Sequence, residues 1–180
     1  MKSLTLLTLA ILILPSFIIQ DRDFNIPELT KIREIHNDEI ETYLYKKGYS
    51  FQESPSFVNP SRRQDVYITN VFLAKNRRGM IRTEYQLEYM VYYNGNYDPK
   101  RYTQTRSVQY LFNSQDLYEE LKSEIISQGY TRKYSISNEL GLVTTYVSKN
   151  NSNLVFKATS HTFGSQFKYS ITSTRYETKK

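Results

Sequence analysis

The sequence predicts an α+β protein made of two tandem duplicated helix-plus-three-strand units, with antiparallel meander sheet or sheets and the helices packed on one face. Three observations predict this class. A capped amphipathic helix follows Ser114, a weaker copy of it lies 81 residues earlier, and each helix precedes three strand-like runs separated by turn-forming residues. Duplication is the simplest interpretation of this pattern. The alternative is two unrelated meanders that each happen to follow a helix.

Residues 1–20 have the layout of a secretory signal peptide. Lys2 gives a positive start, residues 4–14 are apolar or threonine, and Pro15 and Ser16 end the run. No small-x-small cleavage site follows. The apolar span of 16 residues from 4 to 19 is also short for a membrane-crossing helix, which needs about 17–25. We expect removal on export; an uncleaved N-terminal anchor and a buried core helix are the alternatives.

The clearest helix signal follows Ser114. A serine there can cap a helix, and carboxylates in the first turns suit the positive end of the helix dipole. Apolar side chains then recur at helical spacing, and a glycine ends the pattern because it tolerates left-handed backbone. These features are the cap Ser114, the carboxylates Asp116, Glu119 and Glu120, the stripe Leu117, Leu121 and Ile125, and Gly129.

The earlier copy begins at Asn37, which is also a plausible cap. Upstream, Pro27 suits the first turn of a helix, and whether this turn joins the helix at Asn37 is open. We expect residues 21–113 and 114–180 to form two halves of one globular domain. The matching positions are Ile40, Leu44, Tyr45, Gly48 and Tyr49 in the first half and Leu121, Ile125, Ile126, Gly129 and Tyr130 in the second.

Three strand-like runs are predicted after each helix. They are rich in β-branched and aromatic residues or alternate between apolar and polar ones, and Asn- and Gly-containing turns separate them. Residues 52–65, with two prolines, are predicted to form a loop. The runs are residues 66–75, 82–93 and 104–112 in the first half and 140–149, 154–160 and 166–176 in the second.

The sheet face opposite the helices is predicted to be polar. Antiparallel sheets commonly leave one face to solvent, so polarity alone predicts no ligand. Whether the strands form one sheet or two is open. The side chains expected on this face are Glu84, Gln86, Glu88, Ser107 and Gln109 from the first half and Lys157, Thr159, Lys168, Ser170 and Thr172 from the second.

Positive charge concentrates in the strand-and-loop part of each half. Residues 61–113 hold 9 basic and 4 acidic side chains, and residues 140–180 hold 6 and 1, so each part is net +5 in a chain of net +6. The helical parts are net acidic. Solvated loop charge explains this distribution, and specific anion binding is the alternative.

Tyrosine and arginine gather at the turns of the first half and supply the candidate binding residues. Both residue types are common in recognition sites because each buries a large area while keeping a polar tip. The same side chains could equally stack on a sugar or hold a loop in place. The candidates are Arg77, Arg78, Tyr92, Tyr97, Lys100, Arg101 and Tyr102.

The sequence lacks the patterns of common catalytic and metal sites. It has no cysteine, which excludes disulfides, thiol catalysis and cysteine-ligated zinc. Its two histidines, His36 and His161, lie in different halves, and no nucleophile-elbow, zincin, calcium-loop or phosphate-loop motif is present. We therefore predict no catalytic residue, no metal and no cofactor.

These observations favour an exported, non-enzymatic binding protein of the periplasm, cell surface or secreted space. The expected partner is an envelope protein or an anionic glycan. Nucleic acid is not expected for an exported chain, and membrane contact is expected only through an uncleaved N-terminal segment. The alternatives are a secreted hydrolase with an unrecognised site and, from architecture alone, an inhibitor of an exported enzyme. The sequence predicts neither the ligand's identity nor the oligomeric state.

Overall fold

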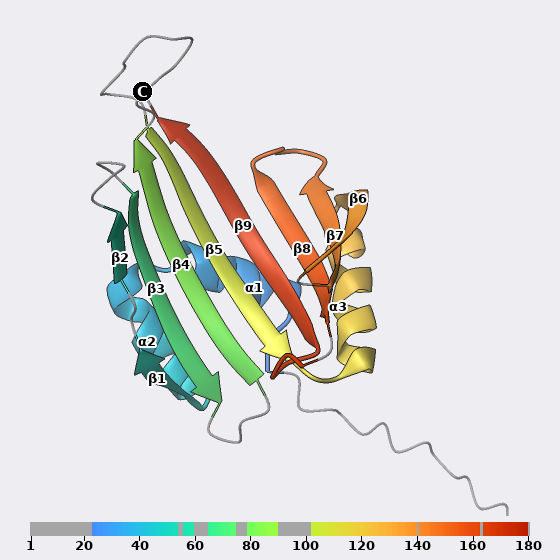
Figure 1. The fold of residues 1–180 in the computed structure, drawn as a ribbon, viewed down its shortest axis with the longest axis horizontal. Helices are drawn as coiled ribbons and strands as arrows, with labels where there is room; N and C mark the ends of the chain where they lie inside the picture. The colour runs from blue at the N-terminus through green and yellow to red at the C-terminus, as the bar shows by residue number, and fades with distance from the viewer. Residues whose placement is uncertain are drawn as a thin grey trace, which may run out of the picture.

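The computed structural model describes residues 23–53, 56–59, 65–74, 79–89, 102–139, 141–162 and 164–179, so the predicted signal peptide or anchor at 1–20 lies outside the described residues. Over these described residues the fold is α+β, mostly antiparallel sheet with three helices (Figure 1). The helices are α1 (Ile26–Glu34), α2 (Asn37–Lys46) and α3 (Gln115–Ser127). The strands are β1 (Tyr49–Glu53), β2 (Ser56–Asn59), β3 (Asp65–Ala74), β4 (Gly79–Tyr89), β5 (Tyr102–Phe112), β6 (Tyr130–Asn138), β7 (Gly141–Ser148), β8 (Leu154–His161) and β9 (Tyr169–Lys179).

The described strands form one nine-stranded sheet, which answers the question of one sheet or two. Its order is β1-β3-β4-β5-β9-β8-β7-β6, with β2 pairing with β3 as well. Every pairing is antiparallel. In each half, the strands therefore follow one another in chain order from an edge of the sheet to its centre. The last strands of the two halves, β5 and β9, pair at the centre.

All three helices lie on one face of the sheet, as predicted (Figure 1). α2 packs against β1, α1 lies across β5 and β9, and α3 packs against β6, β8 and β9. The buried apolar side chains between helices and sheet form one core cluster. Because the helices cover only one face, the other face of the sheet is left for the polar side chains of the strands.

The helix α1 is separate from α2 and occupies the middle of the covered face. Its cap is Asn25, whose side chain accepts a hydrogen bond from the Glu28 N–H while the Glu28 carboxylate accepts one from the Asn25 N–H. Leu29 and Ile32 are fully buried. Arg33 is also buried, and its Nη1 donates a hydrogen bond to the Ser173 Oγ at 2.8 Å. α1 is thereby joined to β9 by a polar contact as well as by packing.

α3 follows the predicted pattern closely. The Ser114 side chain accepts a hydrogen bond from the Leu117 N–H and caps the helix. Leu121 and Ile125 are fully buried on the stripe that faces the core. In α2, by contrast, Asn37 is the first helical residue and not the cap; the cap position is His36, which makes no side-chain cap bond.

The prediction of three strands in each half was incomplete. Each half contributes a fourth strand directly after its helix, β1 in the first half and β6 in the second, and the first half also has β2. The predicted loop at residues 52–65 contains the end of β1, all of β2 and the first residue of β3. The unpredicted strands β1, β2 and β6 each pair on one side only, so an alternating apolar pattern is not required of them.

The two half-sheets begin in the same way. Gly48 and Gly129 have positive φ angles of 83° and 86°, a conformation that costs glycine little. Each is followed by a buried tyrosine, Tyr49 or Tyr130, that opens a strand. Tyr49 pairs with the last residue of β3, and Tyr130 pairs with the last residue of β7.

The first strand of each half also has an irregularity at a corresponding place. In β1 the register shifts between Phe51 and Glu53, and in β6 it shifts between Arg132 and Tyr134. Both shifts start two residues after the tyrosine that opens the strand. A bulge bends its strand locally and increases the twist, so both edges of the sheet are bent in the same part of the half-sheet.

Candidate functional site

The open face of the sheet, opposite the helices, carries a row of polar side chains across four strands. Arg82 on β4 lies opposite Gln109 on β5, Gln109 lies opposite Thr172 on β9, and Thr172 lies opposite Lys157 on β8. Side chains that are directly opposite in antiparallel strands point to the same face. The row is therefore continuous across the central pairing of β5 with β9, with a cation from each half at its two ends.

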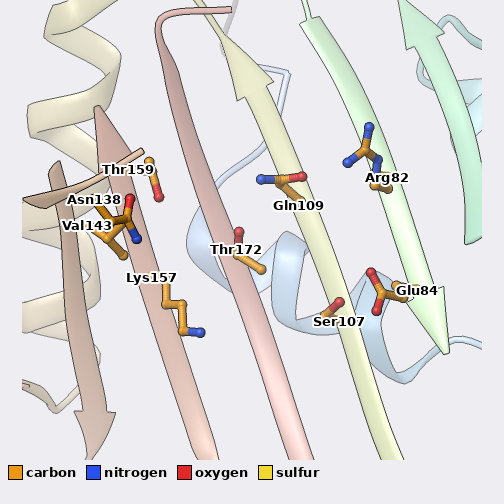
Figure 2. Close-up of a pocket in the computed structure, with 9 residues that line it drawn as sticks. All are labelled: Arg82, Glu84, Ser107, Gln109, Asn138, Val143, Lys157, Thr159 and Thr172. Carbon is orange, nitrogen blue, oxygen red and sulfur yellow. The ribbon is translucent and has the colours of Figure 1, made fainter. Parts of the chain in front are cut away.

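This row lies in a hollow with a volume of about 290 Å³ that is open to solvent. Figure 2 shows Gln109 and Thr172 on neighbouring strands, with Arg82 on one side of them and Lys157 on the other. Only one lining residue, Val143, has an apolar side chain. The hollow is lined by Arg82, Glu84, Ser107, Gln109, Asn138, Val143, Lys157, Thr159 and Thr172.

The charged side chains of the hollow have no charged partner in the described part of the chain. Arg82 is exposed, whereas Glu84 and Lys157 are partly buried, and none of the three forms an ion pair with another described residue. Other charges of the protein are paired: Arg175 on β9 contacts Glu34 at 2.8 Å, for example. Among the described residues, the hollow thus combines two cations and one carboxylate that lack a charged partner with neutral hydrogen-bonding groups.

The edge of the hollow is held by hydrogen bonds centred on Ser170. This serine is fully buried, and its Oγ lies 3.3 Å from the Gln109 Nε2, which donates to it. The His161 Nε2 lies 3.0 Å from the same Oγ. These contacts fix the Gln109 side chain, so one member of the polar row is already oriented before any ligand is bound.

The pair His161 and Ser170 is the arrangement nearest to a hydrolase site in the described residues. A nucleophilic serine must reach its substrate, yet Ser170 is 0% exposed, and neither residue lines the hollow. The Ser170 Oγ is also engaged by Gln109. The pair therefore suits a structural role in the sheet better than attack on a bound substrate.

The tyrosines with a raised pKa lie on the other side of the sheet. Burial, together with neighbouring Tyr110 and Asp23, raises the pKa of Tyr49 far above its usual value. Burial raises the pKa of Tyr118 to about 12, and it also raises the pKa of Tyr146. All three belong to the core between helices and sheet, so they offer no acid or base to the hollow.

Of the candidate binding residues from the sequence, Tyr102 alone falls within the described residues. Tyr102 is the first residue of β5, where its backbone pairs with Tyr89 and Lys179. The other candidates, Arg77, Arg78, Tyr92, Tyr97, Lys100 and Arg101, lie outside the described residues.

Many residues of the predicted polar face, by contrast, line the hollow on the open face of the sheet. Ser170 joins the hydrogen bonds beside the hollow. Asn138, Val143 and Arg82 were missed, although Arg82 has the same strand parity as Glu84. The predicted face residues that line the hollow are Glu84, Ser107, Gln109, Lys157, Thr159 and Thr172.

No group of three or more potential metal ligands of the His, Cys, Asp or Glu type occurs in the described residues. No helix of the described chain has the length and apolar character needed to cross a membrane. Comparison with known proteins finds no matching family, no similar curated protein and no similar solved structure.

Proposed function

We propose that this chain is an exported, non-enzymatic binding protein of the cell envelope or secreted space, and that it recognises its partner through the hollow on the open face. The observation that carries the proposal is the row from Arg82 to Lys157, in which charged side chains without a charged described partner flank hydrogen-bonding groups. Polar groups that converge in a concave surface are typical of binding sites. Export is supported by the sequence of residues 1–20 alone.

We also propose that the fold is a tandem duplication of one helix and four strands. The support is that Tyr49 and Tyr130 each pair with the last residue of the neighbouring strand, β3 or β7. Each tyrosine also follows a glycine with a positive φ angle and precedes a register shift two residues later. On this proposal α2 corresponds to α3, and Arg82 corresponds to Lys157 because each lies opposite one member of the central Gln109–Thr172 pair. α1 and β2 are additions to the first half.

The binding proposal is tested by site-specific photo-cross-linking in the native envelope. A photoreactive amino acid replaces Asn138, an exposed residue of the hollow, or Glu120, an exposed residue on the helix side. We expect one defined species to be captured from Asn138 and not from Glu120, and to disappear when Lys157→Glu is added. Equal capture from both positions, or none from Asn138, would refute recognition through the hollow.

Export has its own measurement. Cell fractionation and N-terminal sequencing of the protein from its natural source should find it outside the cytoplasm, with a start near residue 21 if the segment is removed. A cytoplasmic protein that retains Met1 would contradict the export part of the proposal and leave the role of the hollow to be judged separately.

The hydrolase alternative has one observation in its favour, the contact between His161 and Ser170. If Ser170 were a nucleophile, a serine-directed phosphonate probe would label it and Ser170→Ala would abolish labelling. We expect no labelling, because this side chain is fully buried.

A further inference from the structure

We propose that the ligand of the hollow is an acidic saccharide, and specifically a sugar unit that carries a carboxylate or sulfate group. This inference rests on the proposed binding function and names the chemistry of the partner. It uses four properties of the hollow: the placement of its two cations, its size, the balance of its donors and acceptors, and its lack of aromatic lining.

The two cations bracket the centre of the hollow. Arg82 and Lys157 lie on β4 and β8, three strand-to-strand steps apart across β5 and β9. At about 4.8 Å for each step, their Cα atoms are separated by about 14 Å. A group that rests over Gln109 and Thr172 therefore has a long cationic side chain on each flank. Since neither cation has a charged described partner, an acidic group can pair with either without breaking an existing ion pair.

The size of the hollow selects a small group or one unit of a longer chain. Its volume of about 290 Å³ is just below the usual range for small-molecule sites, which is about 300–1,000 Å³. The hollow is also open to solvent, so a chain that is bound through one unit can continue out of it. This geometry suits one residue of an oligosaccharide.

The neutral lining distinguishes a hydroxylated acid from a simple anion. Ser107, Thr159 and Thr172 can each donate or accept a hydrogen bond, and Gln109 can do both. A phosphate or sulfate ion offers mainly acceptors, and it would be repelled by the Glu84 carboxylate, which has no charged partner among the described residues. A sugar acid also carries hydroxyl groups, one of which can donate to Glu84. The Glu84 carboxylate then stabilises the bound sugar acid through this hydrogen bond.

Two other ligand classes fit the lining poorly. Bases of single-stranded nucleic acids stack on aromatic side chains, and none of the residues that line the hollow is aromatic. Lipid chains need apolar walls, whereas Val143 is the single apolar lining residue. Acidic sugars are thus the class whose charge, hydroxyl groups and size all match.

The test is a binding titration of residues 21–180, the form expected after removal of residues 1–20 on export. Trigalacturonate serves as the acidic probe, galactotriose as the neutral probe and inorganic phosphate as the simple anion. We expect trigalacturonate to bind at least tenfold more tightly than either of the others. Nuclear magnetic resonance should show the largest shifts at the amides of Gln109 and Thr172. Equal binding of galactotriose, or tighter binding of phosphate, would overturn the proposal.

Charge-neutralising variants locate the site. Arg82→Gln and Lys157→Gln should each weaken trigalacturonate binding about tenfold, since a charge-assisted hydrogen bond is lost. The matched control is the double variant Lys133→Gln, Lys149→Gln, which removes two exposed cations outside the hollow and should change affinity less than twofold. An equal loss in the control would indicate diffuse charge attraction. Circular dichroism and the variant Lys157→Arg, which should retain binding, guard against misfolding.

Glu84→Gln separates the sugar from the simple anion. If the Glu84 carboxylate accepts a hydrogen bond from a sugar hydroxyl, this variant should weaken trigalacturonate binding severalfold while phosphate binding rises or stays constant. Tighter binding of both probes would contradict the assigned role of Glu84. Failure of the saccharide proposal can also be distinguished from failure of the proposed binding function. Capture of a partner at Asn138 without any saccharide binding would refute the ligand class alone, and absence of both would refute both.

Discussion

Tyr49 shows how a single buried residue joins the start of the first half-sheet to the chain before α1. Its hydroxyl donates to the Asp23 carboxylate at 2.8 Å, and the Lys47 Nζ donates to the Asp23 carbonyl at 3.1 Å. The same Lys47 forms an ion pair with Glu28, the residue that completes the α1 capping box. One cluster of polar groups thereby fixes the beginning of α1 and the end of α2 together.

Tyr49→Phe should therefore lower the free energy of unfolding by about 1–2 kcal/mol, because a buried hydrogen bond is lost while the ring packing stays. Urea denaturation measures the change. The control is Tyr45→Phe on the exposed side of α2, where Tyr45 is 63% exposed and the expected change is below about 0.5 kcal/mol. Equal effects of the two substitutions would show that the hydroxyl of Tyr49 is not a stabilising contact.

The pKa of Tyr118 predicts how stability depends on alkaline pH. Burial first, and then the neighbouring Tyr146, raises the pKa of Tyr118 to about 12 from an ordinary value of 10. The folded state thus holds a proton that the unfolded state releases between these values. The contribution of protonated Tyr118 to the free energy of unfolding is therefore fully present below pH 10 and is lost as the pH rises toward 12.

We expect the free energy of unfolding to fall between pH 10 and 12, and Tyr118→Phe to make this decline less steep. Urea denaturation at a series of pH values checks the prediction. Because Tyr49 also has a raised pKa, the decline should be reduced by Tyr118→Phe and not abolished. An unchanged slope would mean that Tyr118 ionises alike in the folded and unfolded states.

At the scale of the element, α3 is the part of the fold that the sequence describes best. Its cap, its apolar stripe and the glycine at its end are all local signals, and the structure uses each of them. β6 was missed for a physical reason. Only its first residue, Tyr130, is buried, and as an edge strand it pairs with β7 alone. Its formation depends on the neighbouring strand more than on its own apolar pattern.

The break between α1 and α2 was equally hard to predict. Apolar residues continue at helical spacing through Ile32 and Ile35, yet Ile35 adopts an extended backbone and ends α1. The turn lets α1 cross the middle of the sheet while α2 packs against β1. Tertiary packing therefore decides this boundary, and a periodic pattern in the sequence cannot show it.

Leu121→Ala tests the packing of α3. Leu121 is 0% exposed in the core, so its truncation should lower the free energy of unfolding by about 2–5 kcal/mol. Ile126, on the same helix, is 57% exposed, and Ile126→Ala should cost less than about 1 kcal/mol. Thermal or urea denaturation compares the two. Similar losses would show that the assigned inner and outer faces of α3 are wrong.

At the scale of the whole molecule, the sequence predicted the polar face and not the hollow. Strand alternation correctly grouped residues such as Glu84, Gln109 and Lys157 on one face. The hollow also requires that β5 pair with β9, and the residues paired between these strands lie 57 to 77 positions apart in the chain, from Phe112–Tyr169 to Tyr102–Lys179. No local pattern encodes that pairing, so the row between Arg82 and Lys157 becomes visible only in the folded sheet.

The central pairing predicts that both halves unfold as one unit. β5 and β9 pair along their whole length, and α1 covers the join with buried side chains. In native-state hydrogen exchange, the slowest amides of β4 and β5 should therefore share one opening free energy with those of β8 and β9. Two distinct plateaus, one for each half, would show that the halves are separate folding units.

The central position of β9 has a consequence for synthesis on the ribosome. β9 is the last strand of the sheet to be made, yet it lies between β5 and β8. Until it leaves the exit tunnel, the nascent chain holds two incomplete sheets, and β5 and β8 each present an unpaired edge to other chains. Vectorial folding from the N-terminus can therefore not finish this protein. Its final, cooperative step must wait for the last strand, and a ribosome that stalls before β9 would release an aggregation-prone product.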